Sequence, residues 1–204
     1  MANKEGLLIL FSGPSGVGKD TVLDVVLNKN KELQKSISLT TRNIRDNETD
    51  GKDYYFISVP EFEKMIANGE VLEYAKYGSN LYGTPKGPVD KWLSEGKTVV
   101  LKIEVQGAEN IKKLYPDSVG IFLLPPSMDV LENRLRSRGT EDEEDVKKRL
   151  EIAQNEMQKS KNYDYFVINE DVDCASDDVL TIIKALDFSN KRMNNYISEV
   201  IDNV

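Results

Sequence analysis

The glycine-rich segment 13–20 has the residue types and spacing of a loop that holds phosphate groups; it reads GPSGVGKD. It fits the pattern G-x-x-x-x-G-K-[ST] at every fixed position except the last, where Asp20 replaces a hydroxyl residue. Glycines let the backbone approach phosphates closely, and loop N–H groups and the start of the next helix attract anions. Lys19 adds a positive charge over the β- and γ-phosphates. The segment therefore predicts a nucleotide-binding loop.

Three arginines in segment 127–160 could supply further positive charge to a nucleotide. Arg134 and Arg138 lie four residues apart and so share one helix face, while Arg149 belongs to the next predicted helix. Such a hairpin could simply be a solvated helical face. Beside a phosphate-binding loop, a hairpin that carries cations and closes over the site favours phosphoryl transfer, because the transferring oxygens carry spread negative charge and water must be excluded.

A second group of polar residues lies in the first half of the chain. Arg42 and Arg45 are three residues apart and precede Tyr54, so these side chains could hold a second phosphate or form an ordinary polar turn. Glu104 follows a predicted core strand, and ligands of open α/β sheets bind at the carboxyl ends of the strands. We therefore expect Glu104 to be functional rather than structural.

Apolar runs alternate with helical patterns, which predicts an α/β fold built on a mainly parallel sheet. We expect core strands at 7–12, 35–40, 97–103, 119–124 and 164–168. We expect helices at 19–30, 106–114, 127–138, 141–160 and 175–202, with a short one at 60–68. Ser58 with Glu61, beside Pro60, and Thr140 with Glu143 have the form of capping boxes.

The alternation suggests three units within one three-layer fold. The core would comprise 1–35, 89–126 and 161–204. Segment 36–88 is tyrosine-rich with short strands, and it predicts a small β-rich insertion for a second substrate. Segment 127–160 would be a helical lid.

Composition narrows the possible chemistry. The 204 residues carry a net charge of −8, which argues against nucleic-acid or membrane partners. No histidine is present, so a histidine general base is excluded, and a single cysteine, Cys174, argues against structural zinc and fits the reducing cytoplasm. No apolar run is long enough to cross a bilayer. Whether the chain is a monomer or a homodimer stays open.

Seven motifs in order resemble the guanylate kinase family from near residue 6 to about residue 186. They are GPSGVGKD, SLTTRNIR, GKDYYF, NLYGTP, KIEVQGA, RLRSRGTEDEEDVKKRL and VINED. The resemblance implies a phosphate-loop core with a GMP-binding insertion. It also implies transfer of the γ-phosphoryl of ATP to GMP, with Mg²⁺, giving ADP and GDP.

The resemblance also implies roles for individual residues. ATP would be held by Ser15, Gly16, Val17, Gly18, Lys19, Asp20, Thr21 and Asn169. The GMP phosphate would contact Arg42, Arg45, Tyr54 and Tyr82, and guanine would contact Ser38, Glu73, Thr84 and Glu104. The catalytic residues, which stabilise the transferring charge, would be Lys19, Arg134, Arg138 and Arg149. No general base is required, because the acceptor phosphate oxygen is already ionised.

Two positions depart from the family pattern. Asp20 stands where the family usually has a serine that touches Mg²⁺, and Lys102 stands where it usually has an acidic residue. Asp20 could bind the ion directly or through water, or could point away while Thr21 supplies a hydroxyl. One hypothesis is that the two changes compensate for one another.

Three other functions remain as alternatives. A guanylate-kinase-like interaction module would keep the fold without catalysis, and a kinase for another nucleoside monophosphate would differ only in its base contacts. A GTPase is less favoured: Asp117–Gly120 fits D-x-x-G but precedes a predicted strand, and no N-K-x-D motif exists.

Overall fold

The computed structural model describes residues 5–137 and 143–202, and within them two sheets are present. The central sheet has five parallel strands in the order β2-β7-β1-β8-β9. These strands are β1 (Leu7–Ser12), β2 (Gln34–Lys35), β7 (Thr98–Lys102), β8 (Val119–Leu124) and β9 (Tyr165–Ile168). The α/β fold with a mainly parallel core sheet is thereby confirmed.

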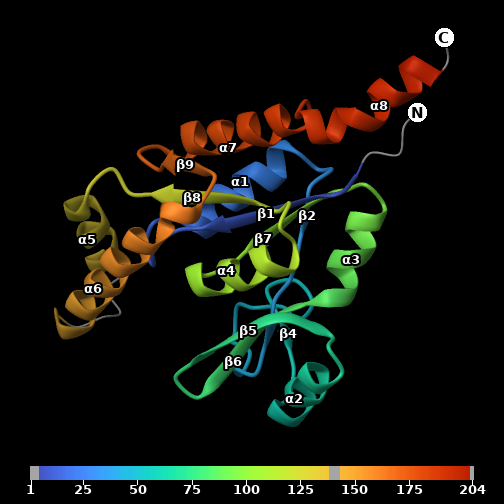
Figure 1. Cartoon of the computed structure of the whole chain (residues 1–204). Helices are drawn as coiled ribbons and strands as arrows, with labels where there is room; N and C mark the ends of the chain where they lie inside the picture. The colour runs from blue at the N-terminus through green and yellow to red at the C-terminus, as the bar shows by residue number, and fades with distance from the viewer. Residues whose placement is uncertain (1–4, 138–142, 203–204) are drawn as a thin grey trace.

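The central strand β1 is buried on both faces and supplies two separate cores. Leu7, Ile9 and Phe11 face one core, and Leu8 and Leu10 face the other. Helices pack on each face and complete three layers (Figure 1). The first core includes residues of α1 (Lys19–Lys29) and α7 (Val172–Leu186), and the second includes residues of α3 (Lys86–Ser94) and α4 (Val105–Leu114).

A smaller mixed sheet lies beyond α4, in the order β4-β3-β6-β5 (Figure 1). Its strands are β3 (Leu39–Thr40), β4 (Tyr55–Phe56), β5 (Val71–Tyr77) and β6 (Asn80–Pro85), and α2 (Val59–Ala67) lies beside it. Helix α2 begins as expected, because the Ser58 hydroxyl accepts a hydrogen bond from the Glu61 N–H at 3.3 Å and Pro60 lies in the first turn. All strands of this sheet come from the segment expected to form the insertion.

The expected strand 35–40 is wrong as a single element. Gln34–Lys35 pairs with β7 in the central sheet, whereas Leu39–Thr40 pairs with β4 and β6 in the small one. The intervening segment 36–38 crosses between the sheets, so one continuous strand cannot serve both.

Two helical expectations also need correction. The expected helix 175–202 is two helices, α7 and α8 (Asn190–Asp202). The N–H groups of Phe188 and Ser189 bond three residues back, which tightens and ends the first helix. Helix α3 was not expected from the sequence.

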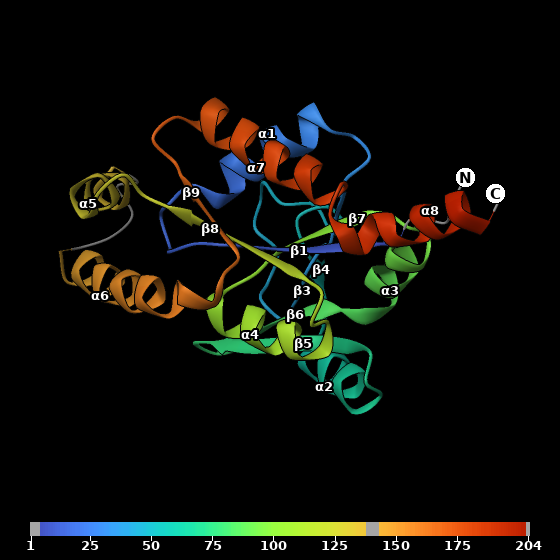
Figure 2. The same cartoon turned by 45° about the horizontal axis from the view of Figure 1, so that its top comes forward.

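Segment 127–160 forms a helical pair that projects beyond one end of the central sheet. Helices α5 (Met128–Arg136) and α6 (Glu143–Lys159) lie side by side in both views (Figures 1 and 2). A short 3₁₀ turn, η1 (Ser160–Asn162), follows α6. Arg138 and the expected cap Thr140 lie outside the described residues. Among the described helices, none is long and apolar enough to cross a membrane.

Candidate active site

The phosphate-binding loop, residues 13–20, leads from the end of β1 into α1. Gly16 and Gly18 have φ angles of +88° and +98°, a region that side chains with a Cβ rarely adopt. Both positions are also crowded: a Cβ on Gly16 would lie 2.6 Å from the Leu135 side chain, and one on Gly18 would lie 2.7 Å from Nδ2 of Asn169. Glycine is therefore required twice for the loop to fold against α5 and the end of β9.

The start of α1 can receive an anion. Gly18 is the N-cap and offers no side-chain hydrogen bond, so no cap competes for the first-turn N–H groups of Lys19, Asp20 and Thr21. Lys19 donates from Nζ to the carbonyls of Gly13 and Pro14, the latter at 3.3 Å. The helix dipole and the lysine place positive charge at the same end of the loop.

Arginines from the helical pair reach the loop from different sides. Arg149 of α6 donates to the Ser15 hydroxyl at 2.6 Å and lines the adjoining cavity. Arg134 of α5 instead donates to the backbone carbonyls of Val17 at 3.3 Å and Asn169 at 2.9 Å. Asn169 Nδ2 also donates to the Val17 carbonyl at 2.7 Å. In this conformation Arg134 and Asn169 hold the loop through hydrogen bonds to the Val17 carbonyl, and neither side chain lines the cavity.

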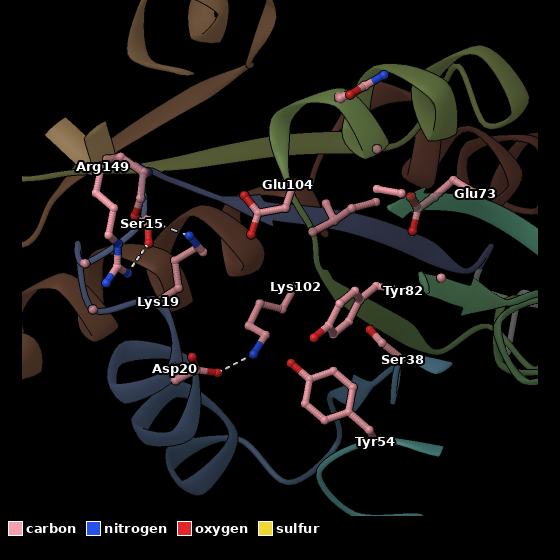
Figure 3. A pocket seen from close by; sticks show the side chains of 18 of the residues that line it. Ser15, Lys19, Asp20, Ser38, Tyr54, Glu73, Tyr82, Lys102, Glu104 and Arg149 are labelled. Atoms are coloured by element: carbon pink, nitrogen blue, oxygen red, sulfur yellow. Dashed lines mark hydrogen bonds and ion pairs between the residues drawn. The ribbon is translucent and has the colours of Figure 1, made fainter. Parts of the chain in front are cut away.

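One cavity of about 510 Å³ joins the phosphate-binding loop to the small sheet (Figure 3). It brings together many of the expected site residues, namely Ser15, Gly16, Gly18, Lys19, Asp20, Thr21, Ser38, Tyr54, Glu73, Tyr82, Glu104 and Arg149. Its other lining residues are Pro14, Ala75, Gly83, Lys102, Ile103, Gln106 and Gly107. Expected residues that do not line it are Val17, Arg42, Arg45, Thr84, Arg134 and Asn169.

Two carboxylates line the cavity: Glu73 of β5 lies on the side of the small sheet, and Glu104, the N-cap of α4, lies between Glu73 and Lys19 (Figure 3). Burial raises the pKa of Glu73, and the nearby Glu104 adds to the rise, although a hydrogen bond from the Thr84 hydroxyl at 2.7 Å opposes it. Gly107 lets α4 approach closely, since a Cβ there would lie 2.7 Å from Glu73 Oε2. The pair favours a ligand that donates hydrogen bonds.

Two tyrosines, Tyr54 and Tyr82, line the cavity with their hydroxyls toward Lys102, and their ring centroids are 6.0 Å apart (Figure 3). Behind them, Arg42 makes two hydrogen bonds to Glu48, at 2.9 and 2.7 Å, and its guanidinium lies 5.5 Å from the Tyr54 ring centroid. Arg45 is exposed. The tyrosine hydroxyls give this side of the cavity a polar wall, and the Arg42 guanidinium, paired with Glu48, lies behind it.

Asp20 and Lys102 form an ion pair within the cavity, between the carboxylate Oδ1 and Nζ (Figure 3). Within residues 5–137 and 143–202, no group of three or more His, Cys, Asp and Glu side chains could hold a metal ion. Magnesium is usually bound through one or two carboxylates together with substrate phosphates. The Asp20 carboxylate is already neutralised by an ammonium group, so this pair does not fit a direct magnesium ligand.

Comparison with known proteins identifies the family. The family model for guanylate kinase matches residues 5–186. The chain belongs to the guanylate kinase family. The guanylate kinase of Oceanobacillus iheyensis is 46% identical over 202 residues, which cover 99% of this chain and 98% of that protein.

Further relatives agree over most of their length. The guanylate kinase of Caldanaerobacter subterraneus is 50% identical over 182 residues, covering 89% of this chain and 88% of that protein. A crystal structure of guanylate kinase from Anaplasma phagocytophilum superposes with a TM-score of 0.78 at 33% identity, covering 94% of this chain and 92% of that one. The fold and the family expected from the motifs are confirmed.

Sequence reasoning missed two polar residues near this candidate site. Glu48 holds Arg42, and Glu156 of α6 interacts electrostatically with Glu104 and Lys19. Burial, together with the charge of Glu104, raises the pKa of Glu156 to about 7. Lys102 was noted as a departure but not as a cavity residue. Only Lys102 left a signal in the sequence, because Glu48 and Glu156 sit in polar stretches that resemble any solvated surface.

Proposed function

We propose that this member of the guanylate kinase family transfers the γ-phosphoryl group of ATP to the phosphate of GMP. The observation that supports this most directly is the single cavity that joins a phosphate-binding loop to a pair of carboxylates. A donor triphosphate on the loop would face an acceptor phosphate beside Tyr54 and Tyr82. The two phosphates would then be aligned for direct transfer.

Guanine selectivity would come from Glu73 and Glu104. Guanine presents N1–H and N2–H₂ as hydrogen-bond donors on one edge, whereas adenine lacks that pair. Two partly buried carboxylates that repel each other would be stabilised by such donors, which adenine does not offer. A site whose polar groups would be left unpaired rejects the wrong base strongly.

Catalysis would rest on charge placed around the transferring group. Lys19 and the N-terminus of α1 face the donor phosphates, and Arg149 reaches the loop from α6. Arg134 would contribute after leaving its backbone partners, and Arg138 stays a prediction from the motif. The acceptor oxygen is already ionised, so no general base is needed.

The family implies Mg²⁺ as the ion that accompanies ATP. Mg²⁺ would enter the site with ATP as part of the co-substrate and would not be held by Asp20. We further propose a cytoplasmic protein, monomer or homodimer, whose partners are ATP and GMP rather than nucleic acid or membrane. The lone Cys174 and the net charge of −8 support this setting.

The experiment that tests the function is an acceptor profile. Purified protein is incubated with ATP and either GMP, dGMP, AMP or UMP, and ADP release is followed with a coupled assay. We expect turnover with the guanine nucleotides well above that with AMP or UMP. Equal use of AMP and GMP would refute guanine selectivity. Clean GMP binding without turnover would refute the kinase proposal and indicate a binding module instead.

A further inference from the structure

The Asp20–Lys102 ion pair bridges two adjacent elements at the carboxyl edge of the central sheet. Lys102 ends β7 and pairs in register with Phe11 of β1, the strand that leads into the phosphate-binding loop. Asp20 lies in the first turn of α1, on the other side of that loop. The contact therefore ties the lysine directly to the loop.

Both partners are charged in this setting. Burial acts to lower the pKa of Lys102, but attraction and hydrogen bonding from Asp20 outweigh it and leave the pKa raised. Burial acts to raise the pKa of Asp20, yet Lys102 brings it below its usual value. An ammonium has three N–H donors, and within the described residues its one hydrogen-bond partner is Asp20. Donors remain available for a ligand.

The ammonium points into the space between the loop and the hydroxyls of Tyr54 and Tyr82 (Figure 3). Its electrostatic partners include Tyr54 and Glu104 as well as Asp20, so it borders the acceptor side of the cavity as well as the donor side. The Lys102 side chain is 25% exposed, whereas that of Asp20 is 70% exposed. The lysine is thus the more enclosed of the two, and the aspartate faces the open side.

We propose that Lys102 is a phosphate-binding residue for the acceptor nucleotide and that Asp20 positions it, rather than serving as a direct metal ligand. This inference rests on the proposed function, because it assigns the phosphate of the nucleoside monophosphate to the space beside Tyr54 and Tyr82.

The first experiment separates phosphate recognition from base recognition. Binding of GMP and of guanosine is measured by calorimetry without ATP or metal, for the parent protein and for Lys102→Met. We expect GMP affinity to fall by about tenfold, the loss expected for one charge-assisted hydrogen bond, while guanosine affinity stays unchanged. Unchanged GMP affinity, or an equal loss for both ligands, would overturn the proposal.

Two further variants serve as controls. Lys102→Arg keeps the charge and should recover part of the lost GMP affinity. Lys97→Met removes a lysine near the opposite end of β7, where Lys97 pairs with Glu95 at 2.7 Å, and should change neither affinity. Retained guanosine binding also shows that each variant is folded.

A double-mutant cycle tests the positioning role of Asp20. In the parent background Asp20→Asn should weaken GMP binding, since the ammonium loses its anchor. In the Lys102→Met background the same change should have no further effect, because no ammonium remains to be positioned. Additive losses would overturn the positioning role.

Spectroscopy of bound Mn²⁺ tests the metal half of the inference. Mn²⁺ binding to the protein–ADP complex is titrated by electron paramagnetic resonance for the parent and for Asp20→Asn. A positioning role predicts equal Mn²⁺ affinity, and a loss of about tenfold or more would show that Asp20 is a metal ligand. If the parent does not phosphorylate GMP at all, the proposed function fails first; normal turnover with an unaffected Lys102→Met variant refutes this inference alone.

Discussion

At the scale of single residues, the proposed function divides the site into groups expected to bind charge and groups expected to read a base. Lys19 lies at the start of α1 and Glu73 lies across the cavity on β5. The first faces a region where negative charge would develop, and the second carries a carboxylate whose pKa burial raises. Replacing Lys19 and replacing Glu73 should therefore have different effects on turnover and on GMP affinity.

Replacing Lys19 with alanine should lower kcat by about 10²- to 10³-fold, because one preorganised contact to the transferring phosphoryl is lost. GMP affinity should change little, since Lys19 bonds to the loop carbonyls and not to the small sheet. Steady-state kinetics with ATP and GMP, together with calorimetry for GMP, measures both quantities. A nearly normal kcat would contradict the assigned role.

Replacing Glu73 with glutamine should weaken GMP binding by roughly 1–3 kcal/mol, because an amide cannot accept both guanine donors as a carboxylate does. AMP binding should not weaken. The matched control is Glu70→Gln, an exposed residue just before β5 that accepts from the Asn68 amide at 3.0 Å. Equal losses for GMP and AMP would mean that Glu73 does not read the base.

At the scale of elements, the loop depends on its fit against α5. The contact between Gly16 and Leu135 links the phosphate-binding loop to the helical pair. Arg134 strengthens this link by donating to the Val17 carbonyl, so α5 supports the loop through both packing and hydrogen bonding. A change in the packing of the loop against α5 should therefore alter the affinity for the nucleotide.

Replacing Gly16 with alanine should destabilise the protein by about 1–3 kcal/mol, because its φ of +88° and the 2.6 Å approach to Leu135 both penalise a Cβ. ATP affinity should fall as well. Gly87→Ala is the control, since nothing lies within 4 Å of its Cβ position in α3. Urea denaturation and ATP titration measure the two effects, and equal stability of both variants would refute the strain argument.

The sequence predicted the elements whose residues carry their own signal. The phosphate-binding loop, the α2 cap at Ser58 and the core strand at 7–12 follow from local pattern. The division of the expected strand 35–40 at residues 36–38 could not be predicted from local sequence, because it depends on which of the two sheets each half pairs with. Similarly, Arg149 was found as a cation, but its partner Ser15 lies 134 residues away and is brought to it by the tertiary fold.

At the scale of the whole molecule, α6 contacts the phosphate-binding loop, where Arg149 donates to the Ser15 hydroxyl. Glu156 of this helix lies near Glu104 and Lys19, and one of its carboxylate oxygens is buried without a hydrogen-bond partner among the described residues. Burial and Glu104 raise the pKa of Glu156 from 4.5 to about 7. Proton binding at Glu156 is thereby linked to folding of the protein.

The stability of the protein therefore depends on pH, because the folded and unfolded states bind different numbers of protons at Glu156. Between pH 4.5 and 7 the folded state holds more protons at Glu156 than the unfolded state, so stability falls as pH rises through that range. Glu156→Gln should flatten this fall and make the protein more stable at pH 8 than the parent. Urea denaturation at pH 5 and pH 8 tests it, with exposed Glu151→Gln on the same helix as control. An unchanged pH profile would contradict the linkage.

The pairing of Arg42 with Glu48 has a further consequence for how tightly a phosphate can be held. Fixing a long, rotamer-rich side chain costs conformational entropy. In the folded protein, two hydrogen bonds to Glu48 and the contact with the Tyr54 ring already hold the Arg42 side chain in place. If Arg42 binds the acceptor phosphate, as its motif predicts, the ligand would meet a preorganised guanidinium and would lose less entropy on binding. Glu48, without contacting the nucleotide, would then contribute to its affinity through Arg42.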